Sequence, residues 1–236
     1  MAMAGQTILA VVPARGGSKS IPRKNLALVG GISLVGRAGE LAASLSWIDE
    51  AIISTDDVEI AAEATRHGLE APFQRPDELA GDKSTSTDMW RHAWLAAEAH
   101  YGQRFEVSIL LEPTSPMRRG EDLTRCVQSL LDSSHKAAAT VSPTPAHFTP
   151  HKTLKVDDAG VLGSYLAEGR HALRQSIPDY YHCNGICYAL RRATLVDDGH
   201  IMEDDCLAVV IDRPIVNIDE PFELELAEWL LAREAD

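Results

Sequence analysis

The sequence predicts an α/β protein, a three-layer sandwich built around a largely parallel sheet. Two observations lead to this fold class. Short apolar runs rich in β-branched residues alternate with amphipathic stretches through the first 141 residues, as strands alternate with helices. In addition, a chain of 236 residues, 45% of them hydrophobic, can bury one large core. We therefore expect residues 1–236 to form a single domain.

The first two elements have the clearest patterns. Ile8–Val12 is a short, mostly β-branched run, which predicts a strand. The stretch 33–45 places Leu34, Leu41 and Leu45 on one face, which predicts a helix.

The later elements continue the alternation. A strand at 51–54 leads to a helix at 58–68, which Gly68 closes in the usual way. We further expect helices at 86–101 and 122–133, strands at 107–116, 136–143 and 184–190, and a strand running into a terminal helix over 215–234.

Residues 142–182 interrupt this alternation. The segment holds several prolines, and the turn-like stretch 157–160 separates two short extended runs, 153–156 and 161–166. We expect these runs to form a β-hairpin that protrudes from the main sheet.

The charge of the chain limits its possible partners. A formal net charge of −13 argues against nucleic acid or a membrane surface as the partner. The four cysteines form no CxxC pair, so zinc is not expected. Because we find neither an export signal nor an apolar run of about 18 residues, we expect a cytoplasmic protein that acts on small molecules.

A basic loop follows the first strand. The stretch "ILAVVPARGGSKSIPRKN" (8–25) joins two glycines to Arg15, Lys19, Arg23 and Lys24. Glycines let backbone N–H groups approach an anion closely, and the basic side chains add charge. The loop matches neither the P-loop pattern nor GxGxxG. It predicts an anion site, with a solvated basic turn as the alternative.

Six blocks in order resemble the N-acylneuraminate cytidylyltransferases, which make CMP-activated sugar acids. They are "VVPARGGSKSIPRKN", "ISTDD" (53–57), "RPDELAGDKSTSTD" (75–88), "LLEPTSPMR" (110–118), "RQSIPDYYHCNG" (174–185) and "VNIDEPFELELAE" (216–228). Together they span nearly the whole chain. The resemblance implies a nucleotide-diphospho-sugar transferase-like fold, related to the Rossmann fold.

The resemblance also implies a CTP site. Arg15, Lys19 and Lys24 would contact the triphosphate, and Arg15 and Lys24 would also be catalytic residues. Asn25 would lie at the nucleoside end. Arg75 and Ser86 would read the cytosine edge, whose carbonyl and ring nitrogen accept hydrogen bonds. For Arg75, the alternative is a surface salt bridge.

A second set of residues would bind the sugar acid. The resemblance gives its carboxylate to Arg174, and its hydroxyls or acyl arm to Asn184 and Tyr188. Tyr188 can also be read as a packed strand aromatic.

Glu112 stands where the family usually has glutamine, and we expect it to face the acceptor. An ionised glutamate only accepts hydrogen bonds, so it would favour an acceptor that offers a hydroxyl or N–H over plain N-acetylneuraminate. A salt bridge to Arg118 or Arg119 is the alternative.

The resemblance implies Mg²⁺, which the family holds with two aspartates one residue apart. Here the pair is Asn217 and Asp219, so one carboxylate is replaced by an amide, a weaker ligand. Asp219 is the stronger candidate, both as ligand and as catalytic residue. Its alternative role is the N-cap of the following helix.

The implied reaction is attack by the anomeric hydroxyl on the α-phosphorus of CTP, with release of pyrophosphate. Two alternatives remain open: another acceptor, such as an eight-carbon sugar acid or a phosphonate, and a relative whose catalysis Asn217 has weakened. The resemblance also implies a homodimer in which the 142–182 insert completes the partner's sugar pocket.

Overall fold

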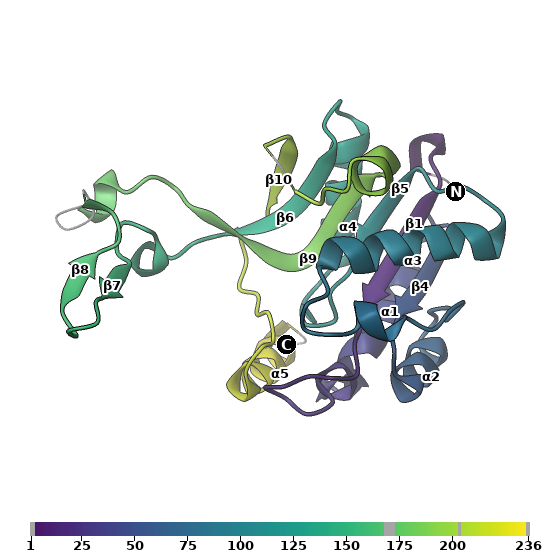
Figure 1. Ribbon diagram of the computed structural model, residues 1–236, viewed down its shortest axis with the longest axis horizontal. Coiled ribbons are helices and arrows are strands. Elements are labelled where there is room, and N and C mark those ends of the chain that lie inside the picture. The colour runs from purple at the N-terminus through teal and green to yellow at the C-terminus, as the bar shows by residue number, and fades with distance from the viewer. Residues whose placement is uncertain (1–2, 168–172, 203, 235–236) are drawn as a thin grey trace.

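A six-stranded sheet forms the centre of the computed structural model, which describes residues 3–167, 173–202 and 204–234. The strand order is β10-β6-β9-β5-β1-β4, and β9 alone is antiparallel to its neighbours. The expected largely parallel α/β sheet is confirmed (Figure 1). The strands are β1 (Ile8–Pro13), β4 (Glu50–Ser54), β5 (Val107–Leu110), β6 (Ala137–Pro143), β9 (Tyr181–Arg191) and β10 (Cys206–Val210).

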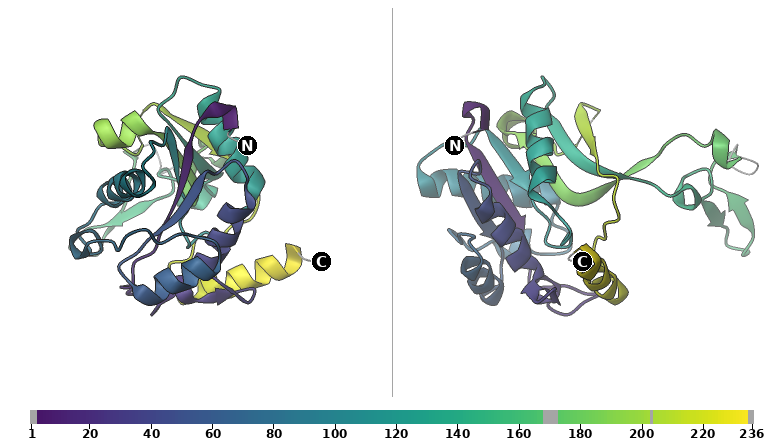
Figure 2. Two further views of the ribbon diagram at one scale, coloured as in Figure 1. Left: turned by 90° about the vertical axis from the view of Figure 1, so that its right-hand side faces the viewer. Right: turned by 180° about the vertical axis from the view of Figure 1, so that it is seen from behind.

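Helices cover both faces of this sheet, which gives the three expected layers (Figure 2). Alternate residues of β1 point to opposite faces. Ile8, Ala10 and Val12 pack in one cluster with α1 (Leu34–Ser44), α2 (Val58–Arg66) and α4 (Gly120–Leu131). Leu9 and Val11 pack in the other with α3 (Ser86–Tyr101) and a π-helical turn, Ala193–Asp197. Burial on both faces explains why β1 is an uninterrupted apolar run.

The helices begin and end at recognisable residues. The carboxylate of Asp57 accepts hydrogen bonds from the N–H groups of Glu59 and Ile60 and so caps α2. Thr85 caps α3 in the same way, and Gly102 ends it in the left-handed conformation.

The C-terminal part differs from the sequence prediction. Residues 215–220 form no strand, whereas β10, which we did not predict, adds a parallel edge beside β6. Val216 and Ile218 are buried against α5 (Pro221–Glu234), and the N–H of Ile218 bonds to the carbonyl of Thr114. The alternating apolar pattern therefore reflects packing under α5, with no sheet ladder beside it.

The expected hairpin protrudes from the sheet as an arm. The ends of β6 and β9 continue as a two-stranded ribbon that pairs Pro143 with Tyr181, and β7 (Leu154–Val156) and β8 (Leu162–Ser164) pair at its tip (Figure 1).

Several short elements complete the chain. No helix in the described ranges is long and apolar enough to cross a membrane. The remaining pieces are the strands β2 (Leu28–Val29) and β3 (Ile32–Ser33) and the 3-10 turns Met3–Gly5, Lys24–Leu26, Asp77–Leu79, Ala146–Phe148 and Arg174–Ser176.

Candidate functional site

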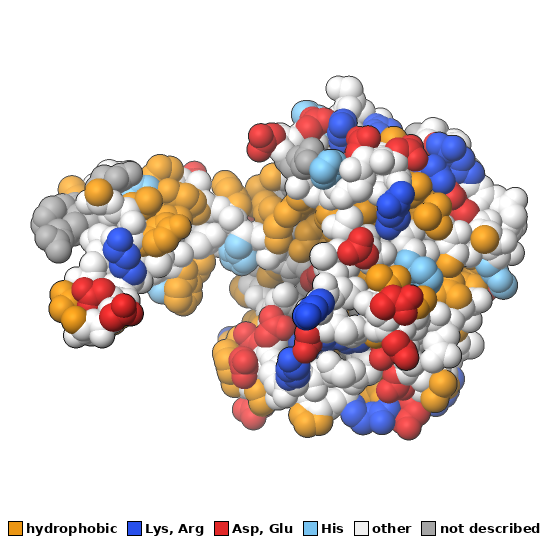
Figure 3. All heavy atoms as spheres, viewed as in Figure 1, with side chains coloured by type: hydrophobic (Ala, Val, Ile, Leu, Met, Phe, Trp, Pro, Cys, Tyr) orange, Lys and Arg blue, Asp and Glu red, His pale blue; other side chains and the backbone are white. Residues whose placement is uncertain are grey.

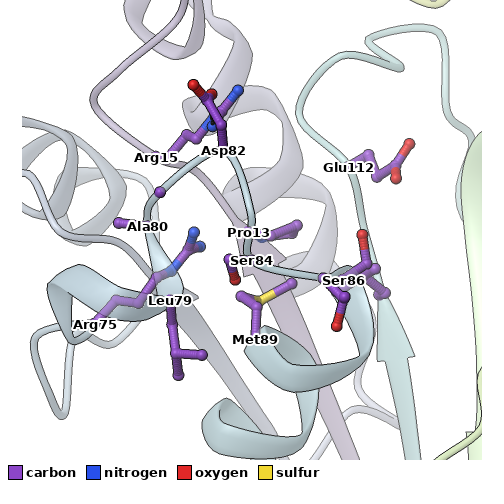
Figure 4. Close-up of a pocket in the computed structure, with 13 residues that line it drawn as sticks. Pro13, Arg15, Arg75, Leu79, Ala80, Asp82, Ser84, Ser86, Met89 and Glu112 are labelled. Carbon is purple, nitrogen blue, oxygen red and sulfur yellow. Dashed lines mark hydrogen bonds and ion pairs between the residues drawn. The ribbon is translucent and has the colours of Figure 1, made fainter.

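A pocket of about 280 Å³ opens at the carboxyl ends of β1 and β5. In the sheet, β1 lies between β5 and β4, and the strand that follows β1 in the main sheet is β4. The order of the strands therefore reverses between β1 and β5, and ligands of open α/β sheets bind at such a point. Arg15, Arg75, Ser86 and Glu112, all selected from the sequence, line it (Figure 4). The other lining residues are Pro13, Leu79, Ala80, Gly81, Asp82, Ser84, Thr85, Met89 and Leu110.

The basic loop gathers around a carboxylate at the rim of this pocket. Asp82 contacts Arg15 at 3.1 Å and Lys19 at 2.6 Å, and Figure 4 shows Arg15 and Asp82 side by side. Hydrogen bonds from Lys19 and Arg15 lower the pKa of the Asp82 carboxyl. The loop therefore presents two cations to one anion, which is the arrangement that a phosphate group needs. Sequence reasoning missed Asp82.

Internal contacts hold the loop in place. Asn25 is buried, and its side-chain amide donates to the carbonyl of Arg15 at 3.0 Å. The N–H of Gly16 donates to Asp56 at 3.0 Å. Arg23 has a positive φ of 56° and pairs with Glu59, away from Asp82. The loop is thus positioned before any ligand arrives.

Arg75 forms part of one wall of the pocket. It is 5% exposed and donates to the hydroxyl and the carbonyl of Ser54 at the end of β4, so the surface salt bridge is excluded. Burial lowers the pKa of its guanidinium to about 10. Ser84, which sequence reasoning also missed, has a buried hydroxyl with no hydrogen-bond partner among the described residues. A free hydroxyl beside a buried guanidinium suits a polar heterocycle.

Glu112 stands on the opposite side of the pocket (Figure 4). Its Oε2 would lie 2.5 Å from a Cβ at Gly185, which has a φ of 70°. Burial raises the pKa of the Glu112 carboxyl, and the Asp219 carboxylate adds to this, whereas Arg118 and Lys24 oppose it. Arg118 donates to the carbonyl of Glu112 at 2.8 Å, and no ion pair joins the two side chains in the described structure.

The sugar-side candidates separate in the structure. Asn184 is 3% exposed, and its amide bonds to Thr140 and Ser142 where the β6–β9 register shifts. Its amide thus stabilises this irregularity, and Asn184 is not among the residues that line the pocket. Tyr188 is half-buried on β9, and burial raises the pKa of its hydroxyl, with the Glu112 charge adding to the effect.

Arg174 belongs to the arm, where its backbone forms part of a 3-10 turn. Its side chain lies outside the described residues.

Asn217 and Asp219 lie on the exposed side of the segment that precedes α5, because Val216 and Ile218 are buried. Lys24 donates to Asp219 Oδ1 at 3.0 Å and to the Ile218 carbonyl at 3.0 Å. The N-cap alternative for Asp219 is wrong. The start of α5 is instead supported from inside the helix by Glu223, whose Oε2 accepts from the N–H groups of Asp219 and Glu220.

The two side chains are oxygen donors, which fit Mg²⁺. Among residues 3–167, 173–202 and 204–234, no group of three or more His, Cys, Asp or Glu is arranged to hold a metal. A cation here would therefore need ligands from elsewhere, such as phosphate oxygens.

Comparison with known proteins identifies the family of the chain. The sequence model of the cytidylyltransferase family matches residues 9–195. A CMP-N,N'-diacetyllegionaminic acid synthase of Campylobacter jejuni is 28% identical over 95% of both chains. An N-acylneuraminate cytidylyltransferase of Escherichia coli O18:K1:H7 is 29% identical over 93% of this chain and 51% of its own length.

A solved structure shares the fold. CMP:2-keto-3-deoxy-manno-octonic acid synthetase, complexed with CTP, superposes with a TM-score of 0.73 and 20% identity, covering 97% of this chain and 99% of that one.

Proposed function

Because the chain belongs to the cytidylyltransferase family, we propose that it is an enzyme that transfers the cytidylyl group of CTP to a sialic acid-like sugar acid. The anomeric hydroxyl oxygen bonds to the α-phosphorus and releases its proton to solvent, and pyrophosphate leaves with the electron pair of the broken bond. The observation that carries this proposal is the pocket, where a basic loop and a buried arginine meet at the carboxyl ends of β1 and β5. Positioning and charge neutralisation supply most of the catalysis in such a reaction.

The nucleotide would enter with its triphosphate at the basic loop. Arg15 and Lys19 would exchange the carboxylate of Asp82 for phosphate oxygens, and Lys24 would turn from Asp219 to the same group. The buried guanidinium of Arg75 would donate to the cytosine acceptors, with Ser86 and Ser84 beside it. Asn25 would act at the nucleoside end by holding Arg15.

Mg²⁺ would neutralise charge on the phosphates, held by Asp219 and the amide oxygen of Asn217. Both side chains lie on the exposed side of the segment before α5, and Lys24 links Asp219 to the basic loop.

The acceptor side would need a second copy of the chain. Arg174 and Tyr188 lie on different parts of the molecule, since Arg174 belongs to the arm that extends away from the sheet (Figure 1). In a cytoplasmic homodimer, the arm of one protomer would carry Arg174 to the sugar carboxylate at its partner's pocket. Neither nucleic acid nor a membrane is a proposed partner.

Pyrophosphate release from CTP tests the proposal. The acceptor panel holds N-acetylneuraminate, a legionaminate, a deaminated sialic acid and an eight-carbon sugar acid. We expect release with at least one nine-carbon acceptor and stronger thermal stabilisation by CTP than by UTP, ATP or GTP.

Three results would change the assignment. Release with the eight-carbon acid alone would move it to that acceptor. CTP binding without release from any acceptor would indicate a catalytically weakened relative. Equal stabilisation by all four nucleotides would contradict the cytosine site.

A further inference from the structure

The 217–219 segment, which we propose to hold Mg²⁺, contributes one carboxylate. A second carboxylate would bind a divalent cation more strongly. Asp219 is ionisable, whereas Asn217 offers only a neutral carbonyl oxygen. Mg²⁺ binds oxygen ligands and strongly favours carboxylates among them. A second carboxylate would therefore have to come from another part of the chain.

Glu112 is next to this segment in space. Its Oε2 and the Ser115 hydroxyl would lie 2.5 Å and 2.6 Å from a Cβ at Gly185, so both atoms occupy the same small space beside β9. The Ser115 hydroxyl in turn lies 3.5 Å from Asn217 Oδ1. Glu112 also lines the nucleotide pocket, so its carboxylate stands between that pocket and the 217–219 segment.

The carboxylate of Glu112 has Arg118 and Lys24 in its surroundings but forms no ion pair with either side chain in the described structure. Arg118 is buried nearby but gives its Nε and NH2 donors to the carbonyls of Ile186, Gly185 and Glu112. No hydrogen bond to the Glu112 carboxylate is present in the described part of the chain. The residue is half-buried in the pocket wall, so its carboxylate is open to a cation that enters the pocket and is not already occupied by a protein donor.

We propose that Glu112 supplies the second carboxylate of the metal site, together with Asp219, and that it takes over the charge that Asn217 lacks. This inference rests on the proposed function, because the cation arrives with the nucleotide. It gives Glu112 a task other than the sugar contact that the resemblance implies. It also gives Gly185 a reason to be glycine, since a side chain there would collide with the Glu112 carboxylate.

The test measures binding of Mn²⁺, a substitute for Mg²⁺, by electron paramagnetic resonance in the presence of the unreactive analogue α,β-methylene-CTP. We expect E112Q to weaken Mn²⁺ binding about tenfold or more, as loss of a metal-supporting group does. Adding N217D to E112Q should restore most of the affinity, because the lost charge returns to the other side of the site. E225Q on the exposed face of α5 removes one negative charge at a distance and should leave the affinity unchanged.

N217D alone provides a second measurement that does not depend on how E112Q folds. With Glu112 already at the metal, we expect a gain below about threefold, smaller than the gain in the E112Q background. A gain of tenfold or more with Glu112 present would overturn the proposal. Unchanged Mn²⁺ affinity in E112Q would overturn it as well.

The outcomes also separate this inference from the proposed function. If the wild type binds neither the analogue nor Mn²⁺ with it, both fail together. If the wild type binds both and E112Q leaves Mn²⁺ affinity unchanged but alters the ratio of kcat/KM between N-acetylneuraminate and a deaminated acceptor, Glu112 faces the sugar. The metal role is then rejected while the proposed function stands.

Discussion

At the scale of single residues, the site depends on carboxylates placed close to cations. Asp82 lies between Arg15 and Lys19, and Asp219 contacts Lys24. These pairs are largely solvent-exposed on the acidic side, so they add little to stability. Their importance is that each keeps a cation in a position where a phosphate group can replace the carboxylate as its partner.

Asp82 should compete with the nucleotide for the basic loop. Replacing it in D82N removes the competing charge, and we expect CTP to bind about two- to tenfold more tightly in isothermal titration. The pKa of Asp82 is lowered, so its contact is complete above the ordinary carboxyl range and is lost only as the pH falls through the lowered value. The gain should therefore be the same near pH 6 and pH 8. Weaker CTP binding in D82N would show that Asp82 helps to bind the nucleotide.

Asp219 should matter for turnover and hardly at all for folding. Its side chain is 71% exposed, and the start of α5 is supported by Glu223, so D219N should lower turnover by roughly a hundredfold or more with little change in Tm. E223A is the matched control. It should lower the free energy of unfolding by about 1 kcal/mol and largely keep metal affinity. A large fall in Tm for D219N would return Asp219 to a structural role.

At the scale of elements, β9 joins the two halves of the sheet. It runs antiparallel between β5 and β6, and its start carries the Asn184–Gly185 corner beside Glu112. The corner is held by two hydrogen bonds, one donated by the Thr140 hydroxyl to the Asn184 side-chain carbonyl and one donated by the Asn184 amide to the Ser142 hydroxyl. The strand thereby sets the wall of the site opposite the basic loop.

Gly185 gives a prediction at this scale. G185A would place a methyl group at a positive φ and against the Glu112 and Ser115 oxygens, so Tm should fall clearly. G102A is the control, because Gly102 has a φ of 66° with nothing within 4 Å of the added Cβ. Both substitutions place alanine at a positive φ, so both should lower Tm. We expect the larger fall in G185A, because only there does the methyl group also meet neighbouring atoms. Equal losses in thermal denaturation would show that no crowding exists at Gly185.

At the scale of the whole molecule, the arm is poorly covered by the rest of its own chain. Large hydrophobic side chains on it are exposed, and Figure 3 shows them gathered over the arm. Exposed apolar surface of this kind indicates a protein partner. The residues are Phe148, Leu154, Val156, Val161, Leu162, Tyr165, Leu173 and Tyr181.

We expect a homodimer at micromolar concentration in light scattering. Leu162 and Tyr165 are each 61% exposed in the single chain, so L162D with Y165D should dissociate the dimer without unfolding the monomer. The variant should keep CTP binding and lose sugar transfer. L28D, at an exposed leucine on β2, should leave the mass unchanged. A monomeric wild type would reject the shared site.

The fold class and most elements could be predicted because their signals are local. Period-2 and period-3.6 patterns and helix-ending glycines such as Gly68 depend on neighbours in the chain. The prediction was wrong at 215–220, where alternating burial came from α5 and no strand formed. It missed β10 because an edge strand is decided by the partner strand β6.

The sequence by itself determined the family, the basic loop and the residues that gather at the pocket, because the order of the motifs and the charges of the side chains can be read without a structure. Only the tertiary structure decided what each side chain does there. It buried Asn184 in the β6–β9 irregularity, supported the start of α5 with Glu223, set Asp82 between Arg15 and Lys19, and brought Glu112 beside Gly185 and Ser115. These contacts join residues far apart in the chain, and whether a polar group is satisfied depends on partners that folding alone brings within bonding distance.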